Sequence, residues 1–237
     1  MISAFSISRV TWKEVPCPGS LVTSMAPPMA STMYLVMALS SRHLLGLIND
    51  VLDMSKIESG KLTLSVDQVS LREVLDSIVS IVQPQVRAKR QHFDVSIHNI
   101  STENVCCDSV RLNQVLLNIL GNAVKFTPDG GRIDVSMYEA PSEKGESFIQ
   151  IHFIISDNGI GMTEEFRQHI FESFVREDST RVRKTEGSGL GMAITKYIVD
   201  AMGGTIDVTS EPGQGTSSRA AARPSMPGSF QYRRMMW

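Results

Sequence analysis

The segment 118–125 contains two side-chain amides and an ammonium group at a spacing that could place them side by side. The residues are Asn118, Asn122 and Lys125. On an α-helix with about 3.6 residues per turn, positions 122 and 125 lie about 40° and 20° around the axis from position 118, so the three side chains point the same way. Amide oxygens can complete the coordination shell of Mg²⁺, and an ammonium can bind phosphate. This face could therefore bind a triphosphate, although polar residues on the solvent side of an amphipathic helix are common.

A carboxylate and a glycine turn follow an apolar run. The segment contains Asp157, Gly159, Ile160, Gly161 and Met162. Apolar residues alternate from 149 to 155, so Asp157 is predicted where a buried strand leaves its sheet. A carboxylate there can accept a hydrogen bond from an exocyclic amine such as that of adenine, and the glycines leave room for a flat ring. A plain hairpin turn is the competing interpretation, because Asn-Gly is a strong hairpin signal.

A third stretch is a glycine nest that opens a helix. It consists of Gly187, Ser188, Gly189, Leu190 and Gly191. Free backbone amides at a helix N-terminus can receive phosphate oxygens. A dinucleotide-binding turn would need a glycine at Met192 and an apolar strand just upstream, and the sequence has neither. The polar segment 178–186 is typical of a mobile lid, with Phe171 and Phe174 as its apolar hinge or, alternatively, as core aromatics.

Composition narrows the class of protein. The chain has 237 residues, of which 42% are hydrophobic and 20% charged, with a formal net charge of −2. This charge gives no reason to expect nucleic acid as a partner. The apolar run 33–39 is too short to cross a bilayer, and no secretory signal is evident at the N-terminus. The three cysteines, an odd number, fit a reducing compartment, so a cytoplasmic location is expected.

The periodicity predicts helices and strands in mixed order. Helices are expected at 41–59, 70–84 with a continuation towards 90, 108–126, 163–171 and 190–202; strands are expected at 93–97, 133–137, 148–155 and 205–208. The helix at 41–59 is amphipathic with near-heptad spacing. We expect an α+β fold, a two-layer α/β sandwich in which a mixed, mostly antiparallel sheet carries helices on one face, preceded by that long amphipathic helix.

The order and spacing of the three stretches resemble the N, G1 and G2 boxes of the ATP-binding domain of two-component sensor histidine kinases, within the GHKL superfamily. The segment 171–174 is similar to the F box of that family, and the segment 44–61 resembles the second helix of its dimerisation and phosphoacceptor hairpin. The resemblance covers about residues 40–216. It implies a protein histidine kinase, an ATP-dependent phosphotransferase that uses ATP and Mg²⁺.

The resemblance also implies roles for individual residues. Asn122 would be the magnesium ligand, Asn118 and Lys125 would act on the phosphates in catalysis, and Asp157 would bind adenine. The glycines of the second and third stretches would shape the pocket and its lid. Gyrase, MutL and heat-shock chaperone relatives carry a glutamate where this chain has Asn118, which favours transfer to a protein over hydrolysis. The implied partners are a response regulator or receiver domain, and a second copy or an intact kinase bound through helix 41–59.

Both ends of the sequence depart from the family pattern. The resemblance divides the chain into an irregular lead-in (1–39), a remnant of the hairpin (40–60), the ATP-binding catalytic domain (61–216) and an atypical tail (217–237). None of the five histidines is followed by an acidic residue and an Arg-Thr-Pro type sequence, as the family's acceptor histidine is. The segment 217–224 is not expected to form the family's final apolar strand. Phosphorylation within the chain is therefore not expected, and a non-enzymatic nucleotide-binding or dimerisation module, or an inactive fragment, is the alternative.

Overall fold

The computed structural model describes residues 29–141, 148–176 and 188–225. In chain order, its elements are α1 (Met29–Glu58), β1 (Asp67–Ser70), α2 (Leu71–Ala88), β2 (His92–His98), β3 (Asn104–Cys107), α3 (Ser109–Phe126), β4 (Arg132–Pro141), β5 (Ile149–Asp157), α4 (Glu164–His169), α5 (Gly191–Ala201), β6 (Thr205–Glu211) and β7 (Gly215–Ala222).

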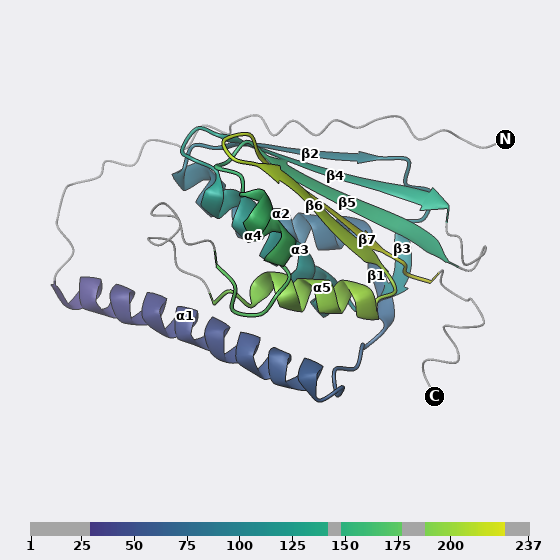
Figure 1. Cartoon of the computed structure of the whole chain (residues 1–237), viewed down its shortest axis with the longest axis horizontal. Helices are drawn as coiled ribbons and strands as arrows, with labels where there is room; N and C mark the ends of the chain where they lie inside the picture. The colour runs from purple at the N-terminus through teal and green to yellow at the C-terminus, as the bar shows by residue number, and fades with distance from the viewer. Residues whose placement is uncertain (1–28, 142–147, 177–187, 226–237) are drawn as a thin grey trace.

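The main sheet has five strands in the order β2-β4-β5-β7-β6. Strands β2 and β4 are parallel, and the other neighbours are antiparallel. Helices α2, α3 and α5 lie against one face of this sheet, and α1 lies beyond them, on the side away from the sheet (Figure 1). Strands β1 and β3 form a separate antiparallel pair. The predicted α+β class, with a mostly antiparallel sheet and helices on one face, is confirmed.

The two central helices begin where the sequence supplies capping side chains. Ser70 caps α2 by accepting a hydrogen bond from the amide of Glu73 at 3.3 Å, and Asp108 caps α3 by accepting one from the amide of Arg111 at 3.0 Å. Such caps satisfy amides that have no partner inside the helix. Helix α2 continues through Pro84 to Ala88, which is close to the longer of the two extents that the sequence allowed.

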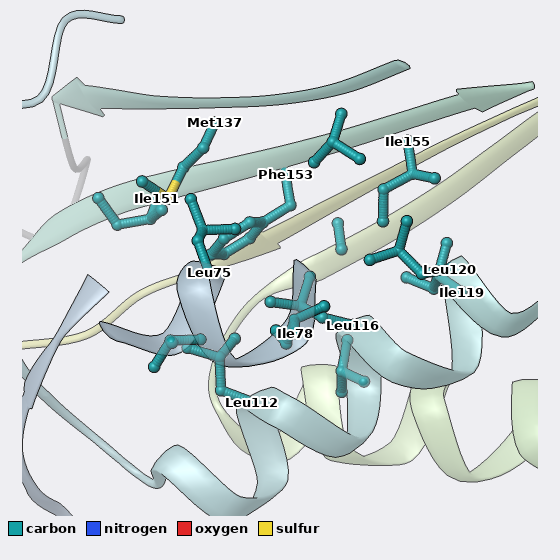
Figure 2. Packing of buried hydrophobic residues seen from close by; sticks show 14 of the residues in the cluster. Leu75, Ile78, Leu112, Leu116, Ile119, Leu120, Met137, Ile151, Phe153 and Ile155 are labelled. Atoms are coloured by element: carbon teal, nitrogen blue, oxygen red, sulfur yellow. The ribbon is translucent and has the colours of Figure 1, made fainter. Parts of the chain in front are cut away.

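The core lies between the helical layer and the sheet. Figure 2 shows side chains of α2 and α3 pointing towards side chains of β4 and β5. The largest of the fully buried side chains in this layer are Leu71, Ile78, Leu116, Leu120, Ile133, Met137, Ile151, Phe153 and Ile155. Burying each such side chain contributes about 1.5 to 3 kcal/mol. This core fixes α3 over the sheet, which positions the polar face of the helix next to the end of β5.

The C-terminal part of the sheet corrects an expectation from the sequence. Residues 217–224 were not expected to form a strand, yet Gly215–Ala222 is β7, which lies between β5 and β6. Its buried side chains are small, with Ala220 at 3% exposure and Ser218 at 6%. Two neighbouring strands supply the apolar side chains, so a strand of alanine and serine can complete the ladder of backbone hydrogen bonds.

The N-terminal boundary also differs from the expectation. Residues 1–39 were expected to be irregular, but α1 begins at Met29, twelve residues before the predicted start at residue 41. Pro27 and Pro28 immediately precede this helix in the sequence, and proline near a helix start removes no hydrogen bond of the helix. The division of the chain into an ATP-binding domain and flanking parts remains a prediction.

Candidate functional site

One cavity of about 590 Å³ lies where α1, α3, α4, the start of α5 and the ends of β5 and β7 meet. Many of the residues that the sequence singled out form its wall. These residues are Asn118, Asn122, Lys125, Asp157, Ile160, Gly161, Met162, Ser188, Gly189 and Gly191. The three stretches are therefore next to one another in space, although the segments 118–125 and 188–191 are far apart in the sequence.

Helix α3 presents its polar face to the cavity. Asn118, Asn122 and Lys125 all line the cavity, as the helical spacing predicted. The amide nitrogen of Asn118 donates hydrogen bonds to the carbonyl of Gly191 and the hydroxyl of Thr195, each at 3.2 Å. These bonds join α3 to the first turn of α5. The ammonium of Lys125 lies 4.8 Å from the ring centre of Phe126, within the range of a cation–π interaction.

Asp157 is the last residue of β5 and is largely shielded from solvent. Burial raises the pKa of its carboxyl above the ordinary value, while hydrogen bonds from the backbone amides of Gly159 and Thr216 act in the opposite direction. The Gly159 amide donates to Oδ1 at 2.8 Å. These bonds fix the orientation of the carboxylate, so it can present a directed acceptor to a ligand in the cavity.

The glycines of the second stretch are required by nearby backbone, and the clearance for a flat ring that the sequence suggested remains a prediction. Gly161 has a φ of +64°, and a Cβ added there would lie 1.9 Å from the carbonyl oxygen of Glu211. A Cβ at Gly159 would lie 2.7 Å from the carbonyl oxygen of Phe126. The turn after β5 is thus packed between the end of α3 and the β6–β7 hairpin, which keeps Asp157 at the cavity wall.

The third stretch is described only from Ser188 onward, so Gly187 lies outside the described residues. Gly189 has a φ of +72°, and a Cβ there would lie 3.1 Å from the backbone of Phe174. Leu190 is 1% exposed and belongs to the core, not to the cavity wall. Gly191 begins α5, and the amides of this first turn have no partner within the helix.

Two predicted aromatic residues do not line the cavity. Phe171 packs against the core, and Phe174 is 69% exposed with a φ of +65°. Phe166 and Ile170 of the α4 region form the cavity wall instead. Phe166 and Ile170 are four residues apart, so helical spacing was a signal that could have indicated them. A hinge role for Phe171 and Phe174 remains a prediction.

Helix α1 also contributes to the cavity, which was not expected from the sequence. Gly46, Leu47 and Asp50 all line the cavity. The hydroxyl of Ser188 donates a hydrogen bond to Oδ2 of Asp50 at 2.8 Å and accepts one from the amide of Leu190 at 3.2 Å. Helix α1 therefore contacts the glycine segment directly. No local pattern indicated that a polar residue of α1 would meet a residue 138 positions away.

Among the helices that the structure describes, none combines the length and the apolar character needed to cross a bilayer.

Comparisons with known proteins point to one family. Residues 107–225 match the family described as histidine kinase-, DNA gyrase B-, and HSP90-like ATPase. Sensor histidine kinase GacS of Pseudomonas protegens is 36% identical over 177 residues, which is 75% of this chain and 19% of that protein. Signal transduction histidine-protein kinase BarA of Escherichia coli is 36% identical over 178 residues, again 75% of this chain and 19% of that protein. The chain therefore spans about a fifth of the length of these curated relatives.

A solved structure shows the same fold. Full-length ShkA, crystallised in complex with AMPPNP, is 28% identical and superimposes with a TM-score of 0.70 over 88% of this chain and 42% of ShkA. The family model, the relatives and this fold agree with one another. The chain belongs to the histidine kinase-, DNA gyrase B- and HSP90-like ATPase family, and within it to the ATP-binding domains of sensor histidine kinases.

Proposed function

We propose that this chain binds Mg-ATP in the cavity and transfers the γ-phosphoryl group to a histidine of a phosphorelay. The observation that carries the proposal is the meeting of Asn118, Asn122 and Lys125 with Asp157 and the start of α5 around one cavity. Its volume of about 590 Å³ lies within the usual range for small-molecule sites. The complex of ShkA with AMPPNP, an ATP analogue, supports the choice of nucleotide.

The residues of α3 fit a magnesium-bound triphosphate. Mg²⁺ usually keeps several water ligands and takes one or two ligands from the protein together with phosphate oxygens. Asn122 would supply the protein ligand, and α3 presents amides and an ammonium to the cavity. The ion, when bound, neutralises charge on the phosphates. Asn118 and Lys125 hold and orient the γ-phosphate, and Asp157 accepts a hydrogen bond from the amino group of adenine.

The proposed transfer to a histidine is a displacement at the γ-phosphorus. The imidazole nitrogen of the acceptor forms a bond to the γ-phosphorus, the bond to the bridging oxygen breaks, and ADP leaves with that electron pair. Asn118 cannot remove a proton from water, so this position offers no general base for hydrolysis. A partner chain would supply the acceptor histidine, because no histidine in the sequence is followed by an acidic residue and an Arg-Thr-Pro type sequence.

An exposed apolar stripe on α1 is a candidate surface for pairing with another helix. It consists of Leu44, Leu45, Ile48, Val51 and Leu52, which are 46% to 60% exposed. Asp50 and Asp53 of the same helix contact the rest of the chain, so the stripe faces away from it. A second copy of the chain or the matching helix of an intact kinase would cover the stripe. A response regulator or receiver domain would then take the phosphoryl group from the acceptor histidine.

The transfer reaction is tested with radiolabelled ATP and a separately expressed acceptor hairpin. The wild-type chain should label the hairpin, Lys125→Met should abolish labelling, and Lys196→Met should have no effect, because Lys196 pairs with Asp200 outside the cavity.

Binding of ATP without any labelling would instead favour a non-enzymatic nucleotide-binding or dimerisation module. The exposed stripe favours that second candidate, and a sedimentation experiment on Ile48→Glu tests whether the stripe forms a dimer.

A further inference from the structure

The last turn of α3 is held by a side chain from another element. Lys89 follows α2 directly, and its ammonium donates hydrogen bonds to the carbonyls of Val124 at 2.7 Å, Lys125 at 3.1 Å and Thr127 at 2.5 Å. The final carbonyls of a helix have no partner within it, and they form the negative end of the helix dipole. A cation there both satisfies the carbonyls and stabilises the dipole.

A second side chain from the same connection reinforces this contact. Gln91 is 8% exposed, and its amide nitrogen donates to the carbonyls of Val124 at 3.0 Å and Thr127 at 2.8 Å. The backbone contributes as well, because the amide of Gly130 donates to the carbonyl of Lys89 at 2.9 Å. The segment between α2 and β2 thus holds the end of α3 through side-chain hydrogen bonds and through a backbone hydrogen bond.

This turn carries one of the phosphate-binding candidates of α3. Lys125 is in the last turn, and Asn122 is about one turn earlier. The carbonyl of Phe126, in the same turn, accepts a hydrogen bond from the amide of Ile160 at 3.3 Å, and Ile160 lines the cavity. Lys89 itself does not line the cavity. Any effect of Lys89 on a ligand must therefore pass through α3.

We propose that Lys89, assisted by Gln91, is a positioning residue for the phosphates of the nucleotide. By fixing the C-terminal turn of α3, Lys89 holds Lys125 and Asn122 in the orientation that binds the triphosphate and its metal ion. This inference rests on the proposed nucleotide site and adds to it a residue that touches no ligand. It predicts that replacing Lys89 weakens the binding of a ligand more when the ligand carries more phosphate groups.

The test compares Mg-ATP with AMP, which carries a single phosphate, by calorimetric titration. Lys89→Met should raise the Kd of Mg-ATP by about tenfold, since the three hydrogen bonds from a charged group are lost, and should change the Kd of AMP by less than about twofold. Lys89→Arg should recover most of the Mg-ATP affinity, because guanidinium also donates several hydrogen bonds. Lys196→Met, an exposed lysine on α5, is the matched control and should change neither Kd.

The outcomes separate this inference from the proposed function. If the wild-type chain does not bind Mg-ATP, the nucleotide site and the positioning role are both wrong. The wild-type chain could instead bind Mg-ATP while Lys89→Met leaves the Mg-ATP affinity unchanged, or lowers the affinities for Mg-ATP and AMP equally. In that case only the positioning role is overturned. Should Lys89→Met fail to fold, Lys89→Gln, which keeps hydrogen-bond donors without the charge, is judged by the same ratio of the two Kd values.

Discussion

Asp53 of α1 and Arg111 of α3 form a largely buried ion pair, with Oδ2 of the carboxylate 2.8 Å from Nη1 of the guanidinium. Gln114 donates a second hydrogen bond to the same oxygen at 2.9 Å. The two side chains are only 12% and 17% exposed. The helix that carries the exposed apolar stripe is thereby attached to the helix that carries the phosphate-binding candidates, so a change in the position of α1 would act directly on α3.

A double-mutant cycle measures this attachment. Asp53→Ala and Arg111→Ala should each lower the free energy of unfolding by about 3 kcal/mol, because each leaves a poorly solvated charge without its partner. The double substitution should cost less than the sum of the two, with a coupling of about 2 kcal/mol. Additive effects in urea unfolding would show that the pair makes no contribution.

The stabilisation by this ion pair should depend on pH, and the direction follows from the pKa of Asp53. Burial acts to raise the pKa of Asp53, but hydrogen bonds from Arg111 and Gln114 outweigh it and hold the pKa below its usual value. A lowered pKa means that the stabilisation is present above the unfolded-state pKa and is lost as the pH falls through the folded-state pKa. The coupling measured by the cycle should therefore vanish in acid, and a coupling that persists there would contradict the pairing.

Asp157→Asn should stabilise the ligand-free chain while it removes nucleotide binding. Because burial raises the pKa of Asp157, the folded state disfavours its charge, and stability falls as the pH rises from the unfolded-state pKa through the folded-state pKa. Asparagine has the same shape and no charge, so the variant should gain stability relative to the wild type above that window and not below it. Urea unfolding of both proteins at several pH values measures the difference; equal stability at neutral pH would contradict it.

Two glycines should respond in opposite ways to alanine. Gly161→Ala should cost about 3 kcal/mol, because the residue has a φ of +64° and the new Cβ would lie 1.9 Å from the carbonyl oxygen of Glu211. Gly121→Ala is the matched control, because Gly121 is inside α3 with no atom within 4 Å of the added Cβ. It should gain about 1 kcal/mol from helix propensity. Thermal unfolding of the two variants compares them, and a tolerated alanine at Gly161 would refute the close packing of this turn.

The small-residue strand β7 can be tested on its two faces. Ala220→Asp places a charge at a core position that is 3% exposed and should lower the free energy of unfolding by about 3 to 5 kcal/mol. Arg219→Ser changes an exposed neighbour in the same strand and should alter it by less than about 0.5 kcal/mol. Similar small effects for both variants would mean that residues 215–222 are not a central strand.

The sequence predicted an element best where the period of its apolar residues and a capping residue agreed. Helix α3 was predicted from Asp108 to Phe126 because an N-cap and an apolar stripe agree there, and its polar face does reach the cavity. Strand β7 could not be predicted, because alanine and serine carry little strand preference and the neighbouring strands β5 and β6 determine the conformation. No local pattern could indicate that Asp50 and Ser188 meet, since that contact depends on how α1 packs on the finished domain.

The most direct test of the account is a calorimetric titration of the purified chain with ATP in the presence of magnesium. We predict one binding site per chain, which Asn122→Ala or Asp157→Asn removes while the circular dichroism spectrum and the cooperative melt are retained. A folded wild-type chain that gives no binding heat with Mg-ATP, or variants that bind it as tightly as the wild type, would contradict the assignment of the cavity.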